Sequence, residues 1–225
     1  MIFCSLHQEE CSISIKPNPK TYFLMIESHK GREEKTIEIE KNIKTCCSAK
    51  GYKIIKATDI KRSKDFLCKI CELIQSVAFA IAVYTDNMPP ATLGNISYEI
   101  GCMHSLGKEV YIIKTSKAKI PSDFIRTEYI EERNIIKDLT KRLEGLRKQA
   151  DYMYSLGELF FEAGDLEKAA EYFKRVYLIV KDPRAINEME VILSKINQIS
   201  KKTEGDKGLH RRLADNLRHF LKLAR

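Results

Sequence analysis

The run from Val77 to Tyr84 places the strongest constraint on the fold, because it is apolar or aromatic at every position. A strand of this kind needs cover on both faces, and the central strands of parallel sheets have such continuous apolar runs. We therefore expect residues 77–84 to form a central parallel strand with helices on both sides of its sheet.

Further strand and helix patterns alternate around this run. Phe66, Ile70 and Leu73, for example, follow the spacing of an amphipathic helix. Alternating strands and helices with short links predict an α/β fold with a parallel sheet flanked by helices. The predicted strands are residues 22–26, 53–57, 110–113 and a short edge strand at 127–130, and the predicted helices are residues 33–49 and 63–75.

One acid, Glu99, lies in a helix predicted between two of these strands. Asn95 is a good N-cap and Gly107 a good C-terminal stop, so we expect this helix from about Ile96 to Leu106. Glu99 would then border the apolar stripe of the helix, where burial raises its pKa and the positive helix N-terminus lowers it. A carboxylate beside an apolar floor suits chemistry on a cationic or oxocarbenium-like centre. The alternative is an ordinary glutamate that stabilises the helix dipole.

Polar residues that follow the strands are candidates for ligand contacts, since ligands of parallel α/β sheets bind beyond the carboxyl ends of the strands. Loops are polar in any case, so we expect only some of these residues to touch a ligand. The dinucleotide fingerprint and the phosphate-binding lysine loop are both missing from the sequence, which argues against dehydrogenase and phosphate-transfer chemistry. The candidates are Ser28, His29, Lys30 and Gly31 after the first strand, Thr58 and Asp59 after the second, Thr85, Asp86 and Asn87 after the third, and Thr115 and Ser116 after the fourth.

From Arg133 onward the apolar pattern is helical, and residues 154–173 resemble a tetratricopeptide repeat. The pattern departs from that repeat at Met153 and Val176. One such helix pair cannot bury its own apolar face, so it should stack on a helix predicted at residues 185–199, on the α/β domain or on another copy of the chain. A generic helical hairpin without a peptide groove is the alternative. The residues that match are Leu156, Gly157, Phe160, Gly164, Ala169 and Phe173.

The composition favours a cytoplasmic protein. No apolar run reaches membrane-spanning length, and Glu9, Glu10 and Cys11 interrupt any signal peptide, so we expect no membrane association. The seven cysteines follow no regular framework and are expected to be reduced thiols. No metal site is expected, because the most metal-like group, Cys4, His7 and Cys11, has no fourth ligand nearby.

The net charge of +8 is concentrated near the C-terminus, where residues 200–225 form a predicted basic helix. A basic segment can bind nucleic acid, an acidic protein or anionic lipid. Because aromatic residues are not interleaved with the basic ones, we favour a solvated helix and do not expect nucleic acid as a partner.

Four short motifs suggest a family for the α/β part. They are Tyr84-Thr85-Asp86, Asn95-Ile-Ser-Tyr-Glu99-Ile-Gly101, Leu106-Gly107-Lys108 and Pro121-Ser122-Asp123. With these motifs, the span from residue 21 to 130 resembles the superfamily that joins nucleoside 2-deoxyribosyltransferases with TIR-like NAD hydrolases. The transferase branch usually carries Asp-x-Gly-Thr ahead of the glutamate, where this chain has Leu93, Asn95 and Ile96, so the TIR-like branch is the better match.

The resemblance implies a flavodoxin- or TIR-like fold that cleaves an N-glycosidic bond in NAD or a related nucleotide, which is the substrate and not a cofactor. Glu99 would be catalytic, and Ser28, His29, Asp59, Asp86 and Asn95 would contact the substrate. In such proteins a fused helical module commonly governs self-assembly or partner contacts, and some members act in antiviral defence.

The expected domains are an irregular lead-in at 1–20, the nucleotide-binding domain at 21–132, the helical module at 133–199 and the basic helix at 200–225. The alternatives are a non-catalytic protein that senses a nucleotide or binds another protein, and a deoxyribosyltransferase.

Overall fold

The computed structural model describes residues 3–4, 9–10, 15–27, 34–59, 66–121, 128–202 and 207–225. The chain divides into two compact units. Lys20–Arg147 forms the unit that contains the large sheet, called here the α/β unit. Met1–Pro19 and Lys148–Arg225 form the other, called here the helical unit.

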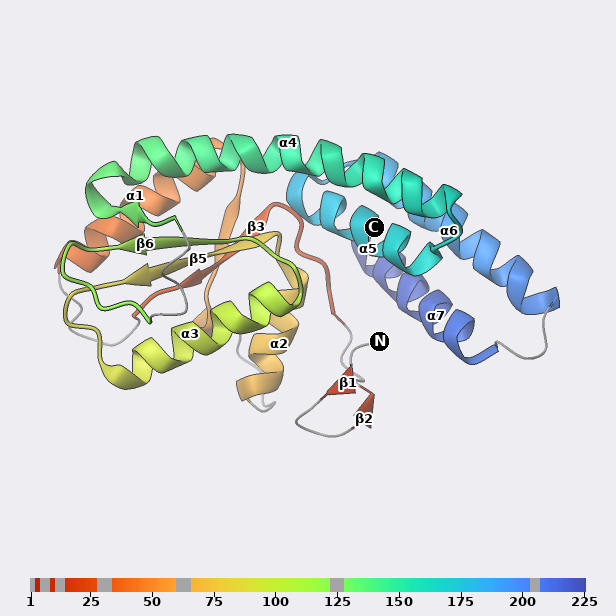
Figure 1. Ribbon diagram of the computed structural model, residues 1–225, viewed down its shortest axis with the longest axis horizontal. Coiled ribbons are helices and arrows are strands. Elements are labelled where there is room, and N and C mark those ends of the chain that lie inside the picture. Colours follow the sequence, from red (N-terminus) through yellow and green to blue (C-terminus); the bar gives the residue numbers. More distant parts are fainter. Residues whose placement is uncertain are drawn as a thin grey trace. The chain divides into compact units, whose positions relative to one another are not determined.

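The α/β unit is built on a five-stranded sheet in which every pairing is parallel. Its strand order is β4-β3-β5-β6-β7, which is the flavodoxin-like order for five strands taken along the chain. Figure 1 shows β3, β5 and β6 side by side. Strand β5 lies at the centre and its residues are fully buried, as the apolar run predicts. The strands are β3 Thr21–Met25, β4 Lys53–Ile55, β5 Phe79–Tyr84, β6 Val110–Lys114 and β7 Ile130–Glu131.

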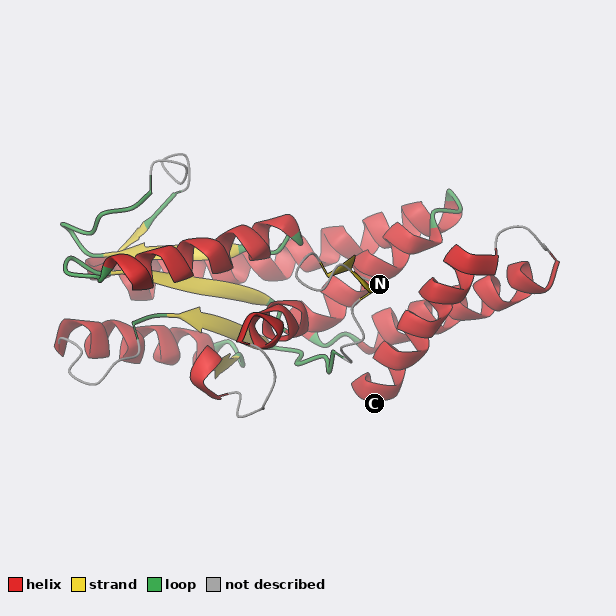
Figure 2. Ribbon diagram, turned by 90° about the horizontal axis from the view of Figure 1, so that it is seen from below, coloured by secondary structure: helices red, strands yellow, loops and turns green. Residues whose placement is uncertain are grey.

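Helices cover both faces of this sheet, which confirms the predicted α/β fold class. Helices α1 (Glu34–Ala49) and the first half of α4 (Ile135–Glu162) lie on one face, while α2 (Phe66–Ser76) and α3 (Pro90–Ser105) lie on the other (Figure 1). Figure 2 shows the strands running side by side between helices. The core under α2 and α3 includes Ile70, Leu73, Ile96, Ile100 and Met103.

Helix α3 begins earlier than its sequence predicted. Pro89 is its N-cap and Pro90 its first residue, so Asn95 lies inside the helix and caps nothing. Proline is favoured at the first helical position because the N–H that it lacks would have no intrahelical partner there. The predicted end is confirmed, since Leu106 is the C-cap and Gly107 has a positive φ of 62°.

The helical unit contains the second half of α4, then α5 (Leu166–Val180), α6 (Pro183–Lys202) and α7 (Lys207–Ala224). Gly157 of α4 faces Phe173 of α5 so closely that a Cβ at position 157 would lie 2.8 Å from the Phe173 ring. Helix α6 packs along both α5 and α7. The helices predicted at residues 185–199 and near the C-terminus are therefore present, and α6 is the element that stacks on the hairpin.

The remaining elements are short. The lead-in, expected to be irregular, contains an antiparallel pair, β1 (Phe3–Cys4) and β2 (Glu9–Glu10). Single turns of 3-10 helix occur at Ala57–Asp59 and Glu132–Asn134. No helix in the described ranges has the length and apolar character needed to cross a membrane.

Candidate functional site

A pocket opens at the carboxyl end of β3. The chain leaves β3 toward β4 on one side and leaves β5 toward β6 on the other, so the crevice lies at the point where the strand order reverses. Its cavity volume is about 260 Å³, slightly below the ~300 Å³ at which most small-molecule pockets start. It is lined by Phe23, Leu24, Met25 and Ile26 from β3 and its end, by Lys56, Ala57 and Thr58 after β4, and by Thr92, Asn95, Ile96 and Glu99 of α3.

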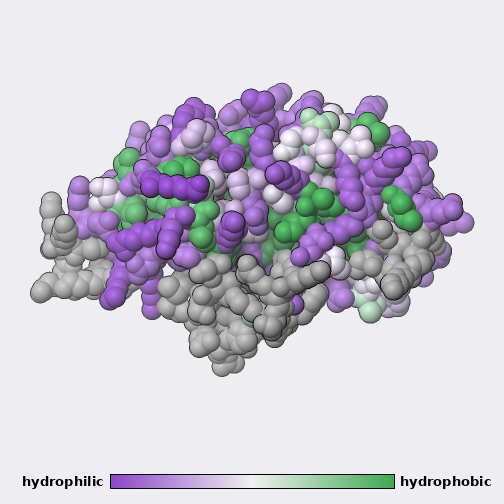
Figure 3. All heavy atoms as spheres, turned by 180° about the vertical axis from the view of Figure 1, so that it is seen from behind, coloured by the Kyte–Doolittle hydropathy of each residue, from purple (hydrophilic) through white to green (hydrophobic). Residues whose placement is uncertain are grey.

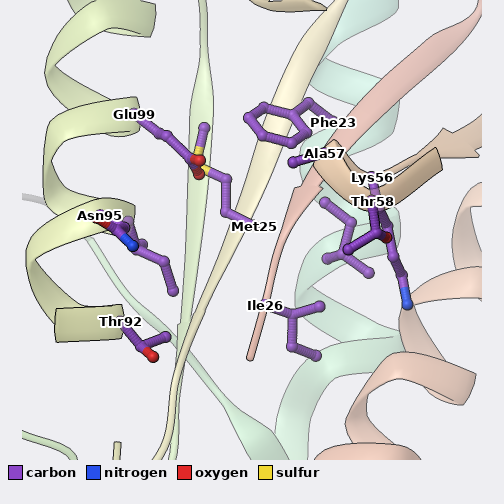
Figure 4. Close-up of a pocket in the computed structure, with 11 residues that line it drawn as sticks. Phe23, Met25, Ile26, Lys56, Ala57, Thr58, Thr92, Asn95 and Glu99 are labelled. Carbon is purple, nitrogen blue, oxygen red and sulfur yellow. The ribbon is translucent and has the colours of Figure 1, made fainter. Parts of the chain in front are cut away.

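Glu99 is the only acid among these lining residues. Its side chain extends from α3 toward Met25 on β3, with Phe23 and Ala57 beyond (Figure 4). The residue is only 8% exposed, and within the described ranges no group donates a hydrogen bond to its carboxyl or forms an ion pair with it. The pocket therefore presents one carboxyl group against a mainly apolar floor.

Burial raises the pKa of Glu99 from 4.5 to about 7. The sequence-based expectation set burial against the helix N-terminus, but α3 begins at Pro90 and Glu99 lies well beyond its first turn. Because the helix dipole acts mainly within the first turn, it does little to hold this carboxyl ionised. Near neutral pH the group is thus divided between its acid and its carboxylate forms.

Two polar residues share the pocket-facing side of α3 with Glu99. Asn95 precedes Glu99 by one turn, and Thr92 precedes it by two, so the three side chains form a row along the helix (Figure 4). Asn95, which the sequence predicted as a substrate contact, therefore lines the pocket. Thr92 was missed, because a helix starting at Ile96 would leave it in the preceding loop.

Lys56 and Thr58 contribute the lining from the loop after β4. Thr58 was among the polar residues expected there, whereas Lys56 was not. The ammonium group of Lys56 lies 2.6 Å from the carboxylate of Glu40 in α1. Its side chain points away from Glu99 (Figure 4), so this cation does not neutralise the carboxyl in the pocket.

Asp59 follows Thr58 but is not part of the pocket lining. Its carboxylate oxygen Oδ2 accepts a hydrogen bond of 2.8 Å from the backbone N–H of Lys56. This bond closes the turn after β4, which is a common role for aspartate in turns. The structure therefore shows a local structural contact for Asp59.

Asp86 also lies outside the lining, in the loop after β5. Its Oδ1 accepts hydrogen bonds from the hydroxyl of Thr115 and, at 2.8 Å, from the backbone N–H of Lys117. The Thr115 hydrogen bond is the largest cause that lowers the pKa of Asp86 below its usual value. Asp86 thus joins the loops that follow β5 and β6.

Two further candidates, Ser28 and His29, lie outside the described residues. Among the residues that the structure does describe, no group of His, Cys, Asp and Glu is arranged to hold a metal ion. The structure therefore places Glu99 and Asn95 in the lining of one pocket and leaves Asp59 and Asp86 outside that lining.

Comparison with protein-family models and with curated proteins found no match to this chain.

Proposed function

We propose that this protein hydrolyses the N-glycosidic bond of NAD or a related nucleotide and that Glu99 is its catalytic residue. The observation that carries the proposal is the Glu99 carboxyl, which is buried, has no partner among the described residues, and faces a pocket at the switch point of a parallel sheet. A desolvated acid at a switch-point pocket is a functional-site candidate.

The chemistry follows from what a carboxylate can do beside a sugar. As the bond from ribose C1′ to the base nitrogen breaks, its electron pair leaves with the base and positive charge develops on the ribose. Ionised Glu99 would stabilise that charge or form an ester with C1′, and water would then supply the hydroxyl group of the product and release a proton. A cationic nicotinamide ring would also lower the pKa of Glu99, because an opposite charge nearby favours the ionised form.

The motif around Glu99 supports the same chemistry. The element from Asn95 to Gly101 resembles the catalytic element of deoxyribosyltransferases and TIR-like NAD hydrolases, and both Asn95 and Glu99 line the pocket. We further propose that the helical unit regulates the site through self-assembly or a protein partner. Its support is the close contact between Gly157 and Phe173, two of the residues whose pattern resembles a tetratricopeptide repeat.

The test is release of nicotinamide from NAD by the full chain, followed by chromatography. Glu99→Gln should lower the rate by about 10³-fold or more, because it keeps the shape of the side chain and removes its negative charge. Glu38→Gln, which alters an exposed acid on α1 away from the pocket lining, should leave the rate unchanged. Equal activity in the wild type and Glu99→Gln would exclude the proposed role.

A non-catalytic nucleotide sensor is the second candidate. It is favoured because Lys56, the other ionisable residue among the described lining residues, is paired with Glu40 and points away from Glu99 (Figure 4), so it does not complete a catalytic pair. Calorimetry with NAD, followed by chromatography of the same sample, distinguishes the two functions. A sensor binds the nucleotide, and the NAD recovered afterwards is intact.

A further inference from the structure

Helix α4 carries an exposed stripe on the side opposite its packed face. Tyr152 is 64% exposed and Leu159 is 57% exposed, although both are large apolar or aromatic residues. Lys148, Ser155 and Glu162 are also exposed and lie on the same side of the helix by its 3.6-residue periodicity. These five residues are called the α4 stripe below.

Single exposed apolar residues need no explanation, and Figure 3 shows small apolar groups scattered among polar ones on one face of the molecule. The α4 stripe differs because the spacing of its residues along the helix recurs on α6, where the residues at that spacing contact α4. On α6, Arg184 and Glu188 contact Tyr154 of α4, and Lys195 lies over the Phe161 ring of α4.

Lys148, Tyr152 and Leu159 have the same spacing on α4 as Arg184, Glu188 and Lys195 have on α6. In stacked helix pairs, equivalent faces of successive first helices make equivalent contacts. The α4 stripe is therefore the face on which another helix would pack, just as α6 packs on α4.

The two ends of the stack that α4, α5, α6 and α7 form differ in polarity. At the far end, Asn197 and Glu190 of α6 bond to Arg218 and Arg225 of α7, so that edge carries polar pairs. Polar outer faces are what terminal helix pairs need to remain soluble. The α4 stripe instead leaves Tyr152 and Leu159 open at the other end.

We propose that the α4 stripe is a symmetric contact with a second copy of this chain, in which the two α4 helices pack antiparallel. Charge complementarity supports this occupant. Lys148 and Glu162 lie two turns on either side of the small residue Ser155, and Tyr152 and Leu159 lie about one turn on either side. A two-fold axis beside Ser155 therefore sets each Lys148 against Glu162 of the other copy and each Tyr152 against Leu159 of the other copy.

The first experiment measures the mass of the full chain by sedimentation from micromolar to millimolar concentration. A contact through one helix pair is small, so we expect a weak, concentration-dependent dimer. Leu159→Glu should raise its dissociation constant about 30-fold or more, as loss of a central anchor does. Val191→Glu is the matched control, because Val191 is 50% exposed on α6 and lies outside the stripe, and it should leave dimerisation unchanged.

The second experiment tests the antiparallel geometry by charge reversal. Lys148→Glu and Glu162→Lys should each weaken the dimer, because like charges then meet in both halves of the contact. An equimolar mixture of the two variants should recover it as a heterodimer, since both pairs across the axis are again opposite in charge. Circular dichroism checks that every variant stays helical.

A wild-type chain that remains monomeric at millimolar concentration would overturn the proposal. A dimer that tolerates Leu159→Glu, or a variant mixture no more associated than its components, would overturn it as well. Neither result depends on NAD cleavage, so this proposal and the proposed function can fail separately.

Discussion

Two acids belong to the same α/β unit, and their surroundings differ in every way that governs charge. Glu99 lines the pocket at the end of β3, is 8% exposed and has no partner in the described part of the chain. Asp86 follows β5 and accepts hydrogen bonds from Thr115 and Lys117. Burial raises the pKa of Glu99 to about 7, whereas hydrogen bonding lowers the pKa of Asp86.

The contrast distinguishes an acid that can interact with a ligand, Glu99, from one that stabilises the fold, Asp86. A carboxylate that already accepts strong hydrogen bonds is stabilised as an anion and has little left to offer a substrate. A carboxyl that has lost water without gaining donors interacts strongly with any cation that enters. The difference also affects stability. At neutral pH the hydrogen-bonded carboxylate of Asp86 stabilises the fold, whereas the buried carboxylate of Glu99, which has no partner among the described residues, destabilises it.

The largest expected effect is on the pH dependence of the proposed NAD cleavage. If ionised Glu99 is required, kcat/KM should fall about tenfold per pH unit well below the pKa of the free enzyme near 7. Because Glu99 is already half protonated at that pKa, the fall between pH 7 and pH 5 should be about 50-fold. Steady-state rates across this range provide the measurement. Asp86→Asn should keep the same profile, because Asp86 is ionised throughout the range; a profile that moved with Asp86 instead would break the comparison.

The next effect is a gain in stability on removing the charge of Glu99. The folded-state pKa of Glu99 lies above its unfolded value, so the folded protein binds the extra proton and loses stability as the pH rises from about 4.5 to about 7. Glu99→Gln should therefore raise the free energy of unfolding by about 3 kcal/mol at pH 8 and by little at pH 4.5. Urea unfolding at both pH values measures this difference, and an equal change at the two would show that the charge is not responsible.

Asp86 should show the opposite sign with a smaller magnitude. Its lowered pKa contributes stability above the range in which a free aspartate titrates, and that stability is lost as the pH falls through the lowered value. Asp86→Asn should decrease the free energy of unfolding by about 1–2 kcal/mol at pH 7, since it weakens the bonds from Thr115 and Lys117.

The same urea measurement tests Asp86, and Thr115→Val provides its cross-check. Thr115 is 1% exposed, so the change removes the donor from the other side of the bond with little change in side-chain shape. In the double variant, the effects of the two single changes on the free energy of unfolding should be strongly non-additive, because both changes remove one shared interaction. Additive effects would mean that Asp86 draws its stability from elsewhere.

The sequence predicted the sheet better than it predicted the site, and the reason is physical. Continuous apolar runs such as Phe79 to Tyr84 encode burial directly, so the strands and their parallel arrangement could be inferred. The start of α3 could not, because Asn95 and the pair Pro89-Pro90 are both good local start signals. The proline pair prevails, and this moves Glu99 out of the first turn and brings Thr92 into the pocket.

The distant partner of Asp86 and the lack of a partner for Glu99 among the described residues were also beyond local reasoning. Asp86 is bonded to Thr115, which lies on the loop after the neighbouring strand, and no spacing rule connects the two positions. Glu99 is defined by the opposite condition, the lack of such a donor in the described residues, which only tertiary structure reveals. Position after a strand therefore indicates the correct edge of the sheet without saying which side chains face the pocket.

The smallest expected effect concerns Asp59, which is close to the pocket in sequence but bonded like Asp86. Its carboxylate closes the turn through the N–H of Lys56, and the residue is exposed. Asp59→Ala should lower the free energy of unfolding by less than about 1 kcal/mol, because water can replace this bond. Because the turn also positions Lys56 and Thr58 at the pocket edge, Asp59→Ala should affect the proposed NAD cleavage as well. That effect should be as slight as the loss of stability. A loss of cleavage as large as that of Glu99→Gln, with stability unchanged, would instead make Asp59 a second catalytic acid and remove the distinction between partnered and unpartnered carboxyls.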